Sequence, residues 1–301
     1  MLNDIPDFLY KKLLRQYNEE EVNIILKGYS KQKPVTLRVN TLKSSVENIE
    51  KKLKDVNLNF EKVEWNKYAL IIKNANEKSI RELDMYKNGE IYLQNLSSMI
   101  PAIILAPKPK ENILDMTAAP GGKTTQMATL SENKALITAC EKNKIRIEKL
   151  KYNIEKQGVS CVNILHKDSR NLDNYFSFDK ILLDVPCSGS GTINLEDEKL
   201  GKYFTEELIN RSKKTQYELL KKAVEILKTG HEMVYSTCSI LEEENEENIK
   251  KILKEGKVEI IPIDKEIIKG VKLLTSKLPG TTVVTPTELY EGFFIAKLRK
   301  K

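Results

Sequence analysis

Residues 112–124 read NILDMTAAPGGKT. In this stretch an apolar run ends in Asp115, small residues and two glycines follow, and a helical pattern begins near Gly122. Small residues and glycines allow backbone N–H groups at a helix N-terminus to approach a ligand closely. The order therefore predicts a buried strand, a tight ligand-contacting turn and a helix, which together open an α/β sheet.

The same alternation continues toward the C-terminus. Apolar runs that are typical of strands cover residues 134–141, 161–168, 178–187 and 231–239. Helical patterns lie between them at residues 142–158 and 204–230. Alternating strands and helices predict a Rossmann-like α/β domain with a mostly parallel sheet and helices on both faces.

Four finer expectations follow from this reading. Gly158 and Gly230 stand where helices should end, because glycine is the usual residue just past a helix C-terminus. A last strand near residues 292–298 should add to the sheet at an antiparallel edge. The polar segment 186–204, which contains three glycines, should form a long loop at the site.

The pattern upstream of residue 96 is different. Two short helices are expected in the first 30 residues, strands near 34–40, 60–63, 69–72 and 90–93, and a helix that opens at Ser44. We predict a small N-terminal α+β domain over residues 1–95 and the Rossmann-like domain over residues 96–301.

Composition limits the class of protein. The 301 residues carry a net charge of +7, which permits a nucleic-acid partner without requiring one. No apolar run approaches the roughly 20 residues of a membrane-spanning helix, and the N-terminus lacks the apolar stretch of a signal peptide. The four cysteines and two histidines do not have the spacing of a zinc site. We expect a cytoplasmic protein with reduced thiols, no metal and no membrane contact.

Four acidic residues stand at the ends of successive predicted strands: Asp115, Glu141, Asp168 and Asp184. In an open α/β sheet, ligands bind beyond the carboxyl ends of the strands. Glu141 lies twenty residues after Gly121, the usual distance for an acid that hydrogen-bonds a ribose hydroxyl. Taken singly, each acid is better explained as a helix cap or a solvated side chain than as a ligand contact. Four acids at one edge are a stronger signal, because like charges repel one another unless a ligand uses them.

Gly122-Lys123-Thr124 suggests a phosphate-binding loop of the nucleotide triphosphatase type. That motif requires glycine at position 117, where this sequence has threonine. The mismatch argues against a triphosphatase. A turn that serves only strand-to-helix packing remains the alternative to a ligand-binding loop.

Two of the four cysteines stand at strand ends. Cys140 and Cys161 lie within apolar strands and are expected to be buried small side chains. Cys187 and Cys238 follow the predicted strands of residues 178–187 and 231–239, so both should lie at the ligand edge. Position alone leaves three interpretations open: a catalytic thiol, a redox pair, or an incidental occurrence.

Several segments together resemble the Sun-type (Nop/Sun family) RNA cytosine-5 methyltransferases. They are DMTAAPGGKTTQMA, ACEKNK, KDSRNL, DKILLDVPCSGSGT and HEMVYSTCSILEEENEENI, with PVTLRVNTLKSS and GEIYLQNLSSMIPA upstream and EGFFIAKLRK at the end. The match runs in order across most of the chain. The resemblance implies an S-adenosylmethionine-dependent Rossmann-like domain preceded by a small RNA-recognition-like domain.

The resemblance also implies roles for individual residues. The loop that should hold the methionine part of the cofactor consists of Thr117, Ala118, Ala119, Pro120, Gly121, Gly122 and Lys123. Glu141 should bind the ribose hydroxyls, Asp168 should lie by the adenine, and Asp184 should lie between the cofactor and the target base. Cys238 matches the family's nucleophile, and Cys187 matches the thiol that helps release the product.

The chemistry explains why these residue types are needed. Carbon 5 of cytosine is a weak nucleophile until a thiolate adds to carbon 6, and an acid at ring nitrogen 3, here Asp184, would stabilise that adduct. DNA cytosine methyltransferases use the cysteine of a Pro-Cys motif, so Cys187 is the rival nucleophile to Cys238. A non-catalytic RNA-binding or ribosome-assembly protein that retains the fold is the alternative to an enzyme.

The expected partner is RNA, either ribosomal or transfer RNA, and the expected state is a monomer. Arg38 and Lys43 are candidate RNA contacts, because RNA binding is largely electrostatic. Tyr92 and Tyr203 could stack on bases, but core or surface packing is the better explanation for either. The acidic run 242–247 is expected to form the first turn of a helix.

Overall fold

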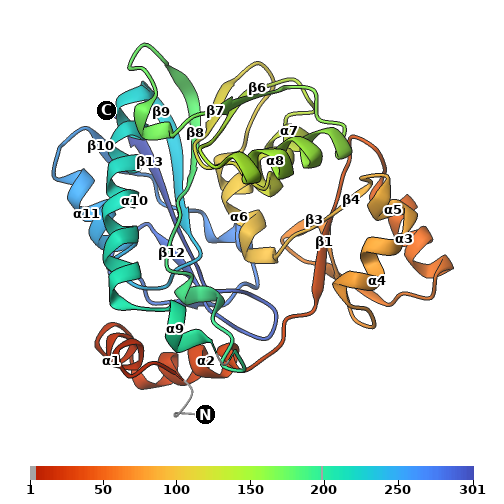
Figure 1. Ribbon diagram of the computed structural model, residues 1–301, viewed down its shortest axis with the longest axis horizontal. Helices are drawn as coiled ribbons and strands as arrows, with labels where there is room; N and C mark the ends of the chain where they lie inside the picture. Colours follow the sequence, from red (N-terminus) through yellow and green to blue (C-terminus); the bar gives the residue numbers. More distant parts are fainter. Residues whose placement is uncertain (1–4, 198) are drawn as a thin grey trace.

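The computed structural model describes residues 5–197 and 199–301, and a large mixed sheet forms its centre (Figure 1). The parallel strands are β5 (Asn112–Asp115), β6 (Leu136–Glu141), β7 (Val162–His166), β8 (Phe178–Asp184) and β9 (Leu227–Thr237). The others are β10 (Val258–Ile260), β11 (Leu273–Leu274), β12 (Thr282–Val284) and β13 (Phe293–Lys300). The strand order is β11-β12-β13-β9-β8-β5-β6-β7, with β10 on β13. The Rossmann-like prediction is confirmed.

Helices cover both faces of this sheet (Figure 1). One face carries α6 (Leu96–Leu105), α7 (Gly122–Leu130) and α8 (Lys144–Lys156). The other carries α10 (Glu206–Ile226) and α11 (Glu246–Leu253). Neighbouring strand residues point to opposite faces, so Ile113 and Leu114 of β5 lie in different core clusters. This explains why the parallel strands are continuous apolar runs in the sequence.

The small sheet is antiparallel, in the order β2-β3-β1-β4. Its strands are β1 (Val35–Val39), β2 (Phe60–Val63), β3 (Asn66–Ile72) and β4 (Ile91–Leu93), and its helices are α3 (Val46–Asp55), α4 (Glu77–Glu82) and α5 (Asp84–Lys87). Ser45 caps α3 by accepting a hydrogen bond from the backbone of Asn48. Ile49 and Leu53 of that helix pack in the core of this sheet.

The first two helices lie apart from the small sheet (Figure 1). Helices α1 (Asp7–Gln16) and α2 (Glu19–Tyr29) pack in the core cluster on the α10 side of the large sheet. The hydroxyl of Tyr17 donates to the carbonyl of Ile240 at 2.6 Å, and that of Tyr29 donates to the carbonyl of Ser190. These helices therefore support the loops that follow β8 and β9, while the domain boundary at residue 95 stays a prediction.

Two finer expectations are wrong. The last strand is antiparallel, but β13 lies between β9 and β12 rather than at the edge. Helix α10 ends at Ile226, and Gly230 lies within β9 at a φ of 79°, where the pairing with β8 shifts register. The chain passes directly from helix to strand because Leu227 pairs with Phe178. Gly158 does follow the end of α8, at a φ of 68°.

The remaining short helices lie in loops. They are η1 (Ser169–Asn171), η2 (Ser190–Thr192), α9 (Leu200–Tyr203) and η3 (Lys265–Ile268). The expected loop over residues 186–204 therefore contains two short helical turns. Within residues 5–197 and 199–301, no helix combines the length and apolar character required to cross a bilayer.

The small sheet is fixed to α8 by backbone-directed contacts. The side-chain amide of Asn40 donates to the carbonyls of Gly89 and Gln157, both at 2.8 Å. Lys43 donates to the carbonyl of Lys156 at 2.7 Å. A Cβ at Gly89, whose φ is 71°, would lie 2.0 Å from that same carbonyl oxygen. Only glycine permits this close approach, which sets the small sheet against the end of α8.

Candidate functional site

The predicted acids do reach one edge of the large sheet. Adjacent strands β7, β6, β5 and β8 lead at their carboxyl ends to Asp168, Glu141, Asp115 and Asp184, respectively. Cys238 follows β9, the next strand along. The parallel order of these strands brings together residues that are far apart in sequence.

A cavity of about 250 Å³ lies at this edge, against the turn after β5. Its lining includes the predicted cofactor residues Thr117, Ala118, Ala119, Pro120, Gly122, Lys123 and Asp184. Gly121 has a φ of 108°, and a Cβ at this position would lie 3.0 Å from the Leu150 side chain of α8. No side chain of the described residues caps the start of α7 at Gly121, so its first backbone N–H groups are available to a ligand.

Asp184 is held by two donors in this cavity. The ammonium of Lys123 lies 2.7 Å from its Oδ2, and the hydroxyl of Ser236 donates to its Oδ1 at 2.7 Å. Lys123 also donates to the hydroxyl of Ser98 at 2.7 Å. The pair is largely shielded from water, with side chains 13% and 27% exposed for Lys123 and Asp184, respectively. Lys123 therefore supplies a fixed positive charge beside Asp184.

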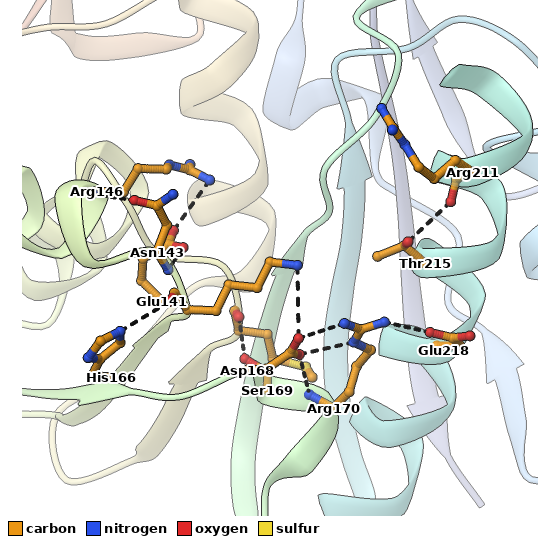
Figure 2. Close-up of polar contacts among 12 residues, drawn as sticks. Glu141, Asn143, Arg146, His166, Asp168, Ser169, Arg170, Arg211, Thr215 and Glu218 are labelled. Atoms are coloured by element: carbon orange, nitrogen blue, oxygen red, sulfur yellow. Dashed lines mark hydrogen bonds and ion pairs between the residues drawn. The ribbon is translucent and has the colours of Figure 1, made fainter. Parts of the chain in front are cut away.

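A second hollow of about 40 Å³ adjoins the first, and Thr117 lines both. Glu141 and Asp168 line it, with Lys142, Arg146 and Arg170 around them. Figure 2 shows Glu141, Asp168 and the two arginines. Glu141 accepts a hydrogen bond from the backbone of Asn143 at 2.8 Å, and Arg146 lies 3.4 Å from its second oxygen. The two hollows therefore meet at Thr117.

Asp168 belongs to a chain of charges at the floor of this hollow. Figure 2 shows Arg170 between the carboxylates of Asp168 and Glu218, at 2.6 and 2.7 Å, respectively. Hydrogen bonding to Arg170 lowers the pKa of Asp168 despite its partial burial. Asp168 therefore presents a fixed, ionised carboxylate to a ligand.

Asp115 is almost wholly buried and has a different environment. Its Oδ2 accepts a hydrogen bond from the hydroxyl of Thr124 at 2.7 Å. Burial, with a smaller contribution from the negative charge of Asp184, raises the pKa of Asp115 from its ordinary value of 3.8 to about 6. The folded protein thus binds this proton more tightly than the unfolded chain does.

This shift predicts a pH-dependent stability. The contribution of Asp115 is fully present below the unfolded pKa of 3.8 and is lost as pH rises through about 6. Relative to an Asp115→Asn variant, the wild type should lose up to about 3 kcal/mol of unfolding free energy between about pH 4 and pH 7. Chemical denaturation of both proteins across this range measures the difference. An Asp179→Asn variant is the control, because hydrogen bonds from Lys228 and Asn112 lower the pKa of Asp179 although burial opposes them. Parallel curves of unfolding free energy against pH for the wild type and Asp115→Asn would contradict the prediction.

The two predicted thiols are in contact. The Sγ atoms of Cys187 and Cys238 lie 3.1 Å apart, and all four cysteines are free thiols. The hydrogen bond to Cys238, reinforced by burial, raises the pKa of Cys187 well above its ordinary range. Cys187 is therefore a thiol near neutral pH that can donate to the sulfur of Cys238. Burial also raises the pKa of Cys140 to about 11, and Cys140 is a buried small side chain, as expected.

Sequence reasoning missed a carboxylate that joins the two cysteine loops. Glu244 is fully buried and accepts hydrogen bonds from the backbone and hydroxyl of Ser188, at 2.8 and 2.5 Å. It also accepts from the hydroxyl of Ser239 at 2.6 Å and the amide of Gln216 at 3.0 Å. Ser188 follows Cys187 and Ser239 follows Cys238, so one side chain fixes both loops.

The expectation for the acidic run is correct only at its end. Helix α11 begins at Glu246, so Glu246 and Glu247 alone lie in its first turn. Glu242 and Glu243 form ion pairs with Lys277 and Lys12 in the preceding turn. The composition of the run could not show which of its acids points inward.

Arg38 is not an RNA contact, contrary to expectation. It is 2% exposed and donates to Gln94 at 3.2 Å and to Thr125 of α7 at 3.1 Å. It therefore joins the small sheet to the helix that follows the cofactor turn. The ammonium of Lys43 holds backbone carbonyls, as described above.

The two tyrosines have different surroundings, and base stacking stays a prediction for both. The Tyr92 ring lies against Gly122, where a Cβ would be 3.2 Å from a ring carbon. The hydroxyl of Tyr203, a half-exposed residue, donates to Asp197 at 3.0 Å.

A wide groove of about 1090 Å³ runs between the small sheet and residues 288–291, and it meets the 250 Å³ cavity at Leu93 and Glu291. Tyr92 thus lines the site without contacting that groove.

Comparison with known protein families gives two matches. A family described as 16S rRNA methyltransferase RsmB/F matches residues 102–299. The ferredoxin-like domain of RsmF/B-like methyltransferases matches residues 5–78. Together the two matches cover the large sheet except for Lys300, and the small sheet except for β4.

Curated relatives include a 28S rRNA (cytosine-C(5))-methyltransferase of Mus musculus, 34% identical over 98% of this chain and 38% of its own length. A tRNA (cytosine(72)-C(5))-methyltransferase of Pyrococcus horikoshii is 39% identical over 74% of this chain and 55% of its own. The chain thus spans about half or less of the length of these relatives. Among solved structures, a methyltransferase homolog protein from Pyrococcus horikoshii is 34% identical with a TM-score of 0.83, covering 99% of this chain and 100% of that chain. The structure of NSun6 from Pyrococcus horikoshii with SFG is 27% identical, with a TM-score of 0.87, and the match covers 100% of this chain and 99% of that chain.

Proposed function

Because the chain belongs to the RsmB/F family of rRNA methyltransferases, we propose that it methylates carbon 5 of a cytosine in ribosomal or transfer RNA. The methyl donor in this proposal is S-adenosylmethionine. One observation carries the proposal: two thiols in contact, at 3.1 Å, stand at the sheet edge that also holds Asp184 and the cavity beside it. Carbon 5 methylation requires a thiol that adds to the ring and a second group that assists release.

The state of the two thiols supports a division of roles. Cys187, whose pKa is raised, retains its proton and can donate it toward the sulfur of Cys238. A hydrogen-bond donor stabilises a neighbouring thiolate, so Cys238 is the nucleophile that adds to carbon 6. Cys187 is then the thiol that assists release of the methylated base.

The ion pair of Asp184 and Lys123 supports charge balance during the addition. In this step Asp184 faces ring nitrogen 3 of the cytosine and gives it a proton as the thiolate adds to carbon 6, so the ring does not keep the negative charge. Lys123, at 2.7 Å from Asp184, offsets the negative charge that this transfer leaves on the Asp184 carboxylate. Both side chains are fixed beforehand by Ser98 and Ser236, so little reorganisation is needed.

The cavities support S-adenosylmethionine as the methyl donor. A methionine-sized part fits the 250 Å³ cavity at the turn Thr117–Lys123, where glycine and alanine leave backbone groups accessible. Glu141 would accept hydrogen bonds from the ribose hydroxyls, and Asp168 would lie by the adenine. When bound, the cofactor supplies an electrophilic methyl group, and the chain supplies its orientation.

The test is direct. The purified protein is incubated with methyl-labelled S-adenosylmethionine and with unmodified ribosomal or transfer RNA in separate reactions. The RNA is then digested to nucleosides. We expect label in 5-methylcytidine, from one of the two RNA classes, and none with a Cys238→Ala variant that still binds the cofactor. Cofactor and RNA binding without any 5-methylcytidine would instead favour a non-catalytic RNA-binding protein that retains the fold.

A further inference from the structure

A third hollow, of about 430 Å³, lies between the small sheet and α8. The charged side chains in its lining are Arg81, Lys149 and Lys156, and the described residues contribute no carboxylate to it. Arg81 comes from α4, and the two lysines come from α8. In Figure 1, α4 lies with the small sheet and α8 covers the large sheet. The hollow is therefore electropositive and is built from both domains.

Aromatic rings contact two of these cations, Arg81 and Lys156. The ammonium of Lys156 lies 3.5 Å from the centre of the Tyr86 ring and 5.5 Å from that of Tyr152. Arg81 donates to the hydroxyl of Tyr86 at 2.6 Å and pairs with Glu77 outside the hollow at 2.8 Å. An aromatic ring orders a cation but leaves its charge in place, whereas a carboxylate would cancel that charge. The ammonium of Lys156 thus stays available to an anion.

The charges around Lys156 favour the binding of an anion. Burial and the neighbouring charges of Arg81 and Lys43 lower the pKa of Lys156, while interaction with Tyr86 partly opposes them. An anion in the hollow would relieve this repulsion. The cofactor has no phosphate, so it does not supply that anion.

Position identifies the ligand. The hollow shares Tyr92, Leu93 and Pro120 with the cofactor cavity, and Leu93 also lines the wide groove. The three spaces therefore adjoin along β4. A single RNA strand carries a phosphate at every nucleotide, so a strand that presents its base at the central cavity can bring a phosphate to this end.

We propose that Arg81, Lys149 and Lys156 bind a backbone phosphate of the RNA strand that carries the target cytosine. The inference rests on the proposed function, because it takes RNA as the substrate. Its ligand chemistry, a phosphate, is shared with free phosphate compounds, and the test separates the two sources.

The experiment measures RNA binding rather than methyl transfer, so its outcome is separate from that of the activity assay. Affinity for an unmodified RNA substrate is measured by fluorescence anisotropy over a range of salt concentrations. The variants are Lys149→Gln and Lys156→Gln, with Lys156→Arg as a charge-conserving variant. Lys151→Gln is the matched control, because Lys151 lies on the same helix, is 55% exposed and pairs with Glu148 outside the hollow.

We expect each Gln variant to bind RNA several-fold more weakly at low salt, with the slope of log affinity against log salt reduced by about one. Lys156→Arg should retain the wild-type slope, and Lys151→Gln should match the wild type. Equal slopes in all the proteins would overturn the proposal, as would an equal reduction in Lys151→Gln. Saturable binding of inorganic phosphate that is lost in the Gln variants, with RNA affinity unchanged, would assign the hollow to a free phosphate compound instead.

Discussion

Replacing Cys187 with alanine should leave the protein covalently attached to its RNA, in an adduct that survives denaturation. In the proposed reaction, Cys238 adds to carbon 6 and carbon 5 accepts the methyl group. A base then removes the carbon 5 proton, the double bond between carbons 5 and 6 re-forms, and the sulfur of Cys238 leaves as a thiolate. The thiol of Cys187, 3.1 Å from the sulfur of Cys238, is placed to assist that departure. Without it, addition and methylation still proceed, but the final elimination is slow, so the adduct accumulates.

Cofactor labelled on the methyl group and a denaturing protein gel make the adduct visible. Wild type, Cys187→Ala and Cys238→Ala are compared, with Cys161→Ala as a control for loss of a thiol away from the sheet edge. Label should migrate with the protein only in Cys187→Ala, and Cys238→Ala should transfer no methyl group to RNA. An adduct in Cys238→Ala instead of Cys187→Ala would exchange the two roles.

Local sequence patterns could predict the sheet edge. The apolar runs, the turn after Asp115 and the acids at the strand ends are local features, and a parallel sheet converts them into neighbours. The contact between Cys187 and Cys238 follows from the same rule, since β8 and β9 are adjacent. The 3.1 Å separation of their sulfur atoms depends on loop packing and could not be predicted.

Features that depend on packing between distant segments escaped prediction. Arg38 lies in an alternating strand that is expected to expose it, yet α7 covers it and its guanidinium binds Thr125. The interior position of β13 depends on β12 and β11, which have 3 and 2 residues and give no readable period. The sequence pattern predicts a helix end at Gly230, but Leu227 already pairs with Phe178 of β8, so the strand begins before Gly230.

Glu244→Ala is expected to lower kcat by about 100-fold while leaving the affinity for the cofactor unchanged. The Glu244 carboxylate is the common acceptor for Ser188 and Ser239, which directly follow the two cysteines. Its removal frees both loops and leaves buried donors without partners, so the two sulfur atoms lose their fixed separation. Displacement of a reacting group by about 1 Å can reduce a rate about 100-fold.

Two further variants separate positioning from stability. Glu244→Gln keeps an acceptor for the backbone of Ser188 and for Gln216, so it should recover part of the lost kcat. Glu246→Ala is the matched control, because Glu246 is equally buried in the same segment but bonds Ser276, away from the cysteines. It should lower the unfolding free energy with kcat per folded molecule retained. If Glu244→Ala loses activity only in proportion to its unfolded fraction, as Glu246→Ala should, Glu244 stabilises the fold and does not position the thiols.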